Sequence, residues 1–143
     1  MLADPTANPF LSLVTLAEDL IVGYILFTKV HIMNSDQDVS ASILAPLAVK
    51  PAYQNRGIGN LLVNKGLKQL RDMGFELVFV LGHPTYDPKF GFTPARKVGF
   101  EAPYSIPQEH ADAWMVKELK TGFIKNTSGK VECADSLNDQ KYW

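Results

Sequence analysis

The spacing of apolar and polar residues first indicates a β-hairpin near the start of the chain. Two β-prone runs, Leu11–Ala17 and Leu20–Val30, are separated only by the polar pair Glu18-Asp19. Two such runs on either side of a short polar turn predict paired antiparallel strands. Gly23 in the second run predicts either a bulge or a close neighbour at that position.

The middle of the chain then changes from strand spacing to helix spacing and back. Ser42–Val49 is apolar enough for a strand, and Pro46, which has no N–H to donate, predicts an edge or a bulge within it. From Ile58 to Met73 apolar residues recur at helical intervals, and Gly74 is a suitable helix cap. The nearly all-apolar run Glu76–Leu81 predicts a strand buried on both faces. This strand, helix and strand order predicts a parallel pair with a right-handed crossover.

The last third of the chain predicts shorter elements. Gly82–Phe92 contains Pro84 and Pro88, which limit any helix there to a short one. Three more strands are expected, one beginning at Phe92, one at Ala113–Leu119 and one at Lys130–Ala134.

Length and composition are those of an ordinary globular domain. The chain has 143 residues, of which 46% are hydrophobic and 20% charged, so it is long enough to bury a core. We expect a single domain over residues 1–143, with an irregular lead-in at residues 1–10 and a strand and tail at residues 121–143.

Charge and cysteine content argue against several classes of function. A net charge of −1 with no cluster of basic residues argues against nucleic acid as a partner. The single cysteine, Cys133, leaves no partner for an intrachain disulfide, and three scattered histidines give no metal-ligand spacing, so no metal is expected. The longest apolar run is too short to span a bilayer. We therefore expect a cytoplasmic protein with no membrane partner.

The stretch from residue 46 to residue 62 indicates an anion site, because an apolar strand leads through a glycine-containing loop into the amphipathic helix. The first-turn N–H groups of a helix have no intrahelical acceptor, and the helix dipole adds positive charge there. Gly57 and Gly59 lack a Cβ and so allow a diphosphate to approach the main chain. Arg56 would add a charge-assisted contact.

Two other kinds of phosphate-binding loop fit this stretch less well. A Walker loop requires Lys followed by Ser or Thr after its last glycine, whereas Asn60-Leu61 stands there. A dinucleotide fingerprint requires a third glycine and a later ribose-binding acid in a βαβ unit, and neither is present.

The hexapeptide Gln54-Asn55-Arg56-Gly57-Ile58-Gly59 resembles the acetyl-CoA signature of the GNAT family of N-acetyltransferases, which is Gln or Arg, two residues, Gly, one residue, then Gly or Ala. Leu47-Ala48-Val49, Pro51 and Tyr53 before it and Phe90-Gly91-Phe92 after it also match the family. The resemblance covers residues 11–120. It implies an α/β GNAT-like fold, with a mixed, mostly antiparallel sheet, a central parallel pair and a cofactor helix. It also implies a bulged strand that splays from its neighbour and admits the pantetheine arm.

The resemblance further implies the reaction and its cofactor. An enzyme of this family transfers the acetyl group of acetyl-CoA to a primary amine by direct attack in a ternary complex and releases CoA. The acceptor would be a small molecule or a peptide. The implied cofactor-binding residues lie in the strand, which aligns the pantetheine, and in the loop, which holds the diphosphate: Leu47, Ala48, Val49, Gln54, Asn55, Arg56, Gly57, Ile58, Gly59 and Asn60.

Three residues are candidates for proton transfer. The family's usual acid is a tyrosine four residues before the glycine of the Gly-Phe pair, and here that position is Asp87, with Tyr86 beside it. Tyr86 would act by turning in, Asp87 would act if burial kept it protonated, and a water molecule is a third source of the proton. His83, whose type ordinarily titrates at about 6.5, suits a base, or it simply caps the end of the buried strand.

Two alternatives remain open at this point. GNAT domains ordinarily begin with a strand and one or two helices ahead of this hairpin, so the N-terminal layer is expected to be shortened or missing. A second subunit would then complete the acceptor site, and a homodimer is one such arrangement. The departure at Asp87 keeps open a second alternative, a catalytically weak module that binds or senses acyl-CoA.

Overall fold

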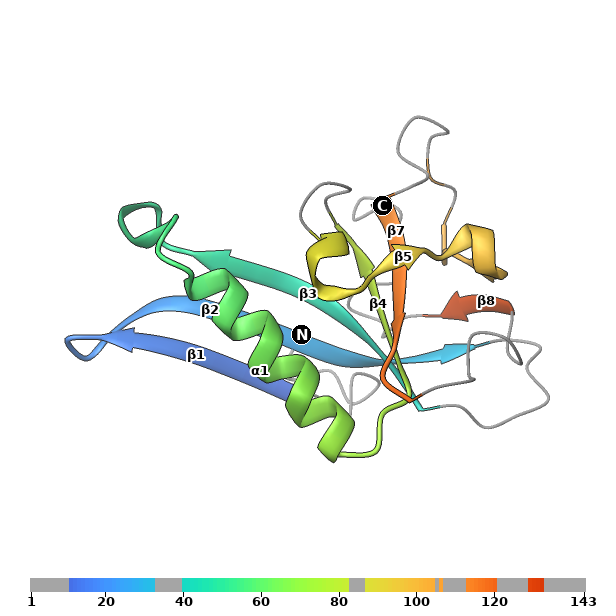
Figure 1. Cartoon of the computed structure of the whole chain (residues 1–143), viewed down its shortest axis with the longest axis horizontal. Coiled ribbons are helices and arrows are strands. Elements are labelled where there is room, and N and C mark those ends of the chain that lie inside the picture. Colours follow the sequence, from blue (N-terminus) through green and yellow to red (C-terminus); the bar gives the residue numbers. More distant parts are fainter. Residues whose placement is uncertain are drawn as a thin grey trace.

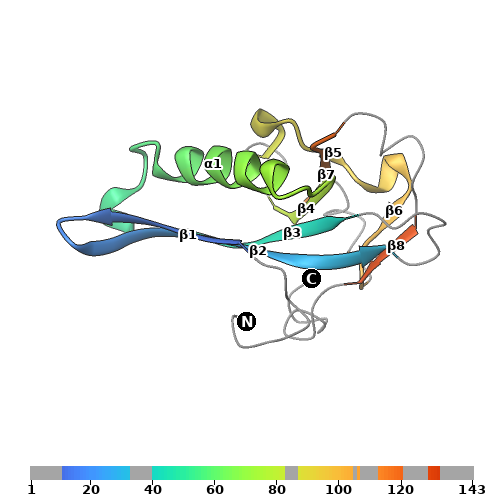
Figure 2. The same ribbon diagram turned by 90° about the horizontal axis from the view of Figure 1, so that it is seen from below.

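The computed structural model describes residues 11–32, 40–82, 87–104, 106, 113–120 and 129–132, in which one face of a mixed sheet carries a long helix (Figures 1 and 2). Seven of its eight strands lie in the order β5-β7-β4-β3-β2-β8-β6, and β1 pairs with β2. The elements are β1 Leu11–Ala17, β2 Leu20–Ile32, β3 Ala41–Val49, η2 Pro51–Tyr53, α1 Ile58–Asp72, β4 Leu77–Leu81, η3 Asp87–Phe90, β5 Thr93–Pro94, η4 Arg96–Val98, β6 Phe100–Glu101, β7 Trp114–Glu118 and β8 Gly129–Glu132.

The predicted hairpin is confirmed. Strands β1 and β2 pair antiparallel, and Glu18 and Asp19 adopt positive φ values of 50° and 64°, as a tight hairpin turn requires. Both interpretations of Gly23 also hold, because the register shifts next to it and a Cβ there would lie 2.8 Å from Cγ2 of Ile58. The hairpin therefore packs closely under the start of α1.

The central strand, helix and strand unit is also confirmed. Helix α1 ends one residue before the predicted position, and the N–H of Gly74 then donates to the carbonyl of Arg71 at 3.1 Å. Strands β3 and β4 pair in parallel from Ala41 opposite Leu77 to Leu44 opposite Val80. The fold is therefore the mixed sheet with a central parallel pair that the sequence predicts.

Each face of the sheet carries its own hydrophobic core. On the helix side, Phe27, Leu44 and the buried face of α1 pack together with Phe90 and Phe92. On the opposite side, Phe79 stacks on Trp114 and meets Phe100 edge-on, with ring centroids 5.2 Å apart in both pairs. These two cores fix the positions of β3 and β4, the strands that border the site.

Strand β3 contains the predicted bulge. Ile25 pairs with Leu47 and Phe27 with Leu44, so the single residue Leu26 lies opposite both Ala45 and Pro46. Pairing with β4 ends at Leu44, whereas pairing with β2 continues to Val49. The second half of β3 thus diverges from β4 (Figure 1).

The elements after residue 86 are short. In the described part of 82–92 the predicted helix is the 3-10 turn η3. The strand expected from Phe92 is only β5, and β7 lies within the predicted Ala113–Leu119. The last predicted strand is β8, and residues 133 and 134 lie outside the described residues.

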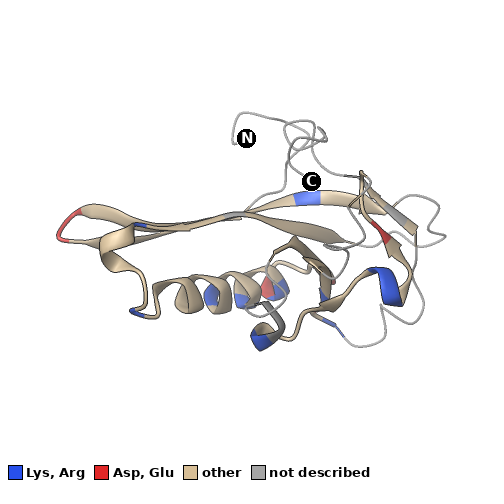
Figure 3. Cartoon of the chain, turned by 90° about the horizontal axis from the view of Figure 1, so that it is seen from above, with Lys and Arg blue, Asp and Glu red and all other residues tan. Residues whose placement is uncertain are grey.

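Lysines and arginines are spread over α1, η3 and η4, while acidic residues mark the hairpin turn (Figure 3). No helix in the described part of the chain is long and apolar enough to cross a membrane.

Candidate functional site

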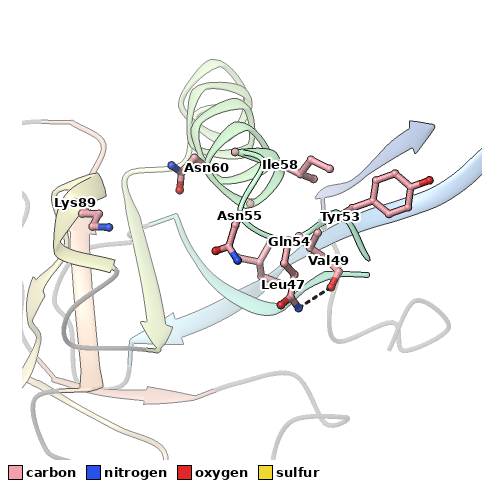
Figure 4. Close-up of a pocket in the computed structure, with 10 residues that line it drawn as sticks. Leu47, Val49, Tyr53, Gln54, Asn55, Ile58, Asn60 and Lys89 are labelled. Atoms are coloured by element: carbon pink, nitrogen blue, oxygen red, sulfur yellow. Dashed lines mark hydrogen bonds between the residues drawn. The ribbon is translucent and has the colours of Figure 1, made fainter. Parts of the chain in front are cut away.

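A cleft of about 590 Å³ lies where the second half of β3, the following loop, the start of α1 and η3 come together (Figure 4). Its described lining consists of Leu47, Val49, Tyr53, Gln54, Asn55, Gly57, Ile58, Gly59, Asn60 and Lys89. The cleft is therefore built from two walls that are distant in sequence, one at residues 47–60 and the other at residue 89.

The strand side of the cleft exposes backbone as well as side chains. The N–H of Lys50 donates to the carbonyl of Val22 in β2 at 2.8 Å. Since N–H and C=O groups alternate between the two edges of a strand, those of Leu47 and Val49 point to the other edge, from which β4 has diverged. The carbonyl of Val49 accepts a hydrogen bond from Nε2 of Gln54 at 3.1 Å, in agreement with this direction (Figure 4).

The loop between β3 and α1 makes two sharp changes of direction. The N–H of Tyr53 donates to the carbonyl of Lys50 at 2.8 Å, which closes the 3-10 turn η2. Asn55 and Gly57 then adopt left-handed conformations with φ values of 63° and 81°. A side chain at Gly57 would meet open space, so glycine is favoured there by the backbone conformation and not by crowding within the protein.

The first turn of α1 is suited to an anion. The first intrahelical bond runs from the N–H of Leu61 to the carbonyl of Gly57 at 3.0 Å, so the preceding amides have no acceptor within the helix. Gly57 occupies the N-cap position and has no side chain with which to cap them. The first turn contains no acidic residue. The helix therefore presents its positive end to the cleft.

Eight of the ten residues predicted from sequence to bind the cofactor line this cleft, and Ala48 and Arg56 do not. Ala48 pairs with Tyr24 and is exposed. The guanidinium carbon of Arg56 lies 5.2 Å from the ring centroid of Tyr53, so this arginine packs on its own loop. Sequence reasoning missed Lys89, because it belongs to a segment whose position depends on the packing of η3.

The proton-transfer candidates fall largely outside the described residues. His83 and Tyr86 lie in the undescribed stretch 83–86, and Asp87 is the first residue of η3. His31 lies exposed near the end of β2. Within the described ranges, no group of three His, Cys, Asp or Glu residues is placed to hold a metal ion.

Comparison with known protein families shows which family this chain is related to. Residues 3–92 match the model of the acetyltransferase (GNAT) family. The chain belongs to the GNAT family. It is 45% identical over 136 residues to the N-acetyltransferase YjhQ of Escherichia coli strain K12, an alignment that covers 94% of this chain and 75% of YjhQ. The family's cofactor is acetyl-CoA, and its members are acyltransferases.

Two solved GNAT structures share the fold. The Escherichia coli protein YhbS, solved in complex with CoA, aligns with a TM-score of 0.80 at 29% identity, covering 90% of this chain and 69% of YhbS. A GNAT acetyltransferase from Brucella melitensis, solved in complex with acetyl-CoA, aligns with a TM-score of 0.68 at 26% identity, covering 92% of this chain and 70% of its own. These likenesses agree with the mixed sheet and parallel strand pair described above.

Proposed function

We propose that this protein transfers the acetyl group of acetyl-CoA to a primary amine of a small molecule or peptide, by direct attack in a ternary complex. The observation that carries the proposal is the meeting of the diverging half of β3 with the first turn of α1 in one cleft. The CoA and acetyl-CoA bound to the two structural relatives support it.

The lining fits the two chemically different parts of this cofactor. A diphosphate is anionic, and the start of α1 offers first-turn amides, two glycines and no acidic side chain. Pantetheine contains amide and methylene groups, and the β3 side offers the side chains of Leu47 and Val49 next to outward-facing main-chain groups. We therefore assign the diphosphate to Gly57–Asn60 and the pantetheine arm to β3.

The reaction needs an acceptor amine held against an activated carbonyl. When bound, acetyl-CoA supplies a thioester whose carbonyl carbon forms the new C–N bond as its C–S bond breaks, the amine losing a proton and the thiolate gaining one. The N–H of Val49 points toward the side from which β4 diverges, so we assign it the stabilisation of negative charge on the carbonyl oxygen. Fixed positioning of the two reactants lowers the barrier by roughly 7–11 kcal/mol in favourable cases.

Proton transfer is assigned to the segment that leads into η3. Tyr86 is our candidate acid for the leaving thiolate, His83 is the candidate base for the amine, and Asp87 is the alternative acid. His83 and Tyr86 precede η3 in the chain, Asp87 is its first residue, and Lys89 of the same turn lines the cleft. The substitutions Tyr86→Phe and Asp87→Ala separate the two acids, because each removes one proton donor and leaves the cofactor-binding loop unchanged.

The cofactor site is tested by calorimetric titration with CoA and acetyl-CoA. We expect Gly57→Trp to abolish binding, because its side chain would occupy the cleft. Gly74→Trp is the matched control: both glycines have positive φ (81° and 98°) and open space around a Cβ, but Gly74 lies at the other end of α1. Absence of binding by the folded parent, or equal binding by both variants, would contradict the proposed site.

The reaction itself is tested by following thiol release from acetyl-CoA with a panel of amines. The panel includes peptides, polyamines and amino acids, lysine among them. We expect at least one amine to be acetylated, with the product confirmed by mass spectrometry. Binding of CoA without acetylation of any amine would instead favour a module that binds or senses acyl-CoA.

A further inference from the structure

We propose that Lys89 binds the cofactor's diphosphate from the wall of the cleft opposite α1, so that the diphosphate is held between a helix start and a lysine. This inference rests on the proposed function and adds to it a residue from a different part of the chain. It explains how the cleft supplies a full positive charge although the loop at 54–60 contributes only main-chain and neutral side-chain groups to the lining.

The first observation is the distribution of charge around the cleft. Lys89 is the one charged side chain among the described residues that line it. Figure 4 shows Lys89 on η3 with its amino group directed into the cleft, toward the side that carries Asn55 in the loop and Asn60 on the first turn of α1. A diphosphate at the helix start would therefore lie between the helix dipole and the ammonium group.

The second observation is that the backbone carrying Lys89 is fixed by its neighbours. Phe90 is 9% exposed and Phe92 2% exposed, and both pack in the core beneath α1. The ammonium group of Lys117 in β7 donates a hydrogen bond of 2.5 Å to the carbonyl of Phe90. This attachment holds the turn against the sheet, so Lys89 projects from an anchored position.

The third observation concerns the cation that the sequence motif suggests. Arg56 lies within the signature hexapeptide, yet its guanidinium packs over Tyr53 and it does not line the cleft. Arg56 and Lys89 are both exposed and both cationic, but only Lys89 lines the cleft. The structure thereby makes opposite predictions for two otherwise comparable substitutions.

The experiment measures the affinity of the parent, Lys89→Met and Lys89→Arg for CoA and for dephospho-CoA, which lacks the 3′-phosphate and keeps the diphosphate. Lys97→Met is the matched control, because it removes the same charge from the exposed turn η4, away from the cleft lining. We expect Lys89→Met to lower the affinity for both ligands equally, by about three- to tenfold, as expected for the loss of a solvent-accessible hydrogen bond from a charged group. We also expect Lys89→Arg to restore most of the affinity, and the loss to shrink in high salt.

Several results would overturn the inference. If Lys89→Met binds CoA as tightly as the parent, or loses no more affinity than Lys97→Met, then Lys89 makes no specific contact with the cofactor. A loss seen with CoA but not with dephospho-CoA shows that the lysine contacts the 3′-phosphate instead. If the folded parent binds neither ligand, the proposed cofactor site fails as well, which distinguishes that failure from the failure of Lys89 alone.

Discussion

The two halves of β3 differ in what surrounds them. The first half, Ala41–Leu44, pairs with β2 on one side and β4 on the other, and all four of its side chains are buried. The second half, Ala45–Val49, pairs with β2 alone, and Leu47 and Val49 line the cleft. A single strand thus supplies core packing along one half and ligand-accessible backbone along the other. Substitutions in the two halves should therefore separate stability from binding.

The largest expected effect is on stability and comes from the first half. Ile43 is 2% exposed and packs in the core opposite α1, so Ile43→Ala should lower the free energy of unfolding by about 2–5 kcal/mol. Urea denaturation measures this loss. At low temperature, where the variant stays folded, its affinity for CoA should match that of the parent. A loss below about 1 kcal/mol would contradict the structural role assigned to this half.

In the second half, we expect a smaller loss of stability together with a loss of CoA affinity. Leu47 is half-buried, packs at the margin of the helix-side core and lines the cleft. Leu47→Ala should lower the free energy of unfolding by about 1–2 kcal/mol, less than Ile43→Ala, because less apolar surface is lost. Its affinity for CoA should nevertheless fall several-fold, as titration calorimetry would show. Unchanged affinity would mean that the pantetheine arm does not pass along this half of the strand.

The smallest effect is expected just beyond β3, at Arg56. Arg56→Met removes an exposed cation that packs on Tyr53, so the free energy of unfolding should fall by less than about 1 kcal/mol. The affinity for CoA should change by less than about twofold, in contrast to Lys89→Met. If Arg56→Met weakened CoA binding as strongly as Lys89→Met, the loop would bind the cofactor through its side chains as well as its amides.

Most of the fold follows from local patterns in the sequence. The apolar runs on either side of Glu18-Asp19 predict the hairpin, and the helical spacing from Ile58 predicts α1. A proline within an apolar run predicts an edge or a bulge, and β3 contains the bulge. Each of these signals involves neighbouring residues, so it is present before the chain folds. The short elements after residue 86 are less predictable, because their lengths are set by what they pack against.

The site could be predicted only in part, for a related reason. The wall at residues 47–60 is continuous in sequence, and a glycine loop before a helix identifies it. Lys89 belongs to the opposite wall, and its place there depends on Phe90, Phe92 and the hydrogen bond from Lys117. The orientation of Arg56 likewise depends on the ring of Tyr53. Tertiary contacts of this kind leave no periodicity in the sequence.

The bulge in β3 makes the cleft depend on the number of residues in the strand. Leu44 and Leu47 both pack on the helix-side core, although residues three apart on a regular strand face opposite ways. The extra residue opposite Leu26 produces this change of phase. Deleting one residue there would leave Leu47 opposite Ile25 and on its present face, but it would remove the bend that the bulge introduces and so bring the second half of β3 back toward β4. The cleft thus depends on one extra residue in β3 as well as on the side chains that line it.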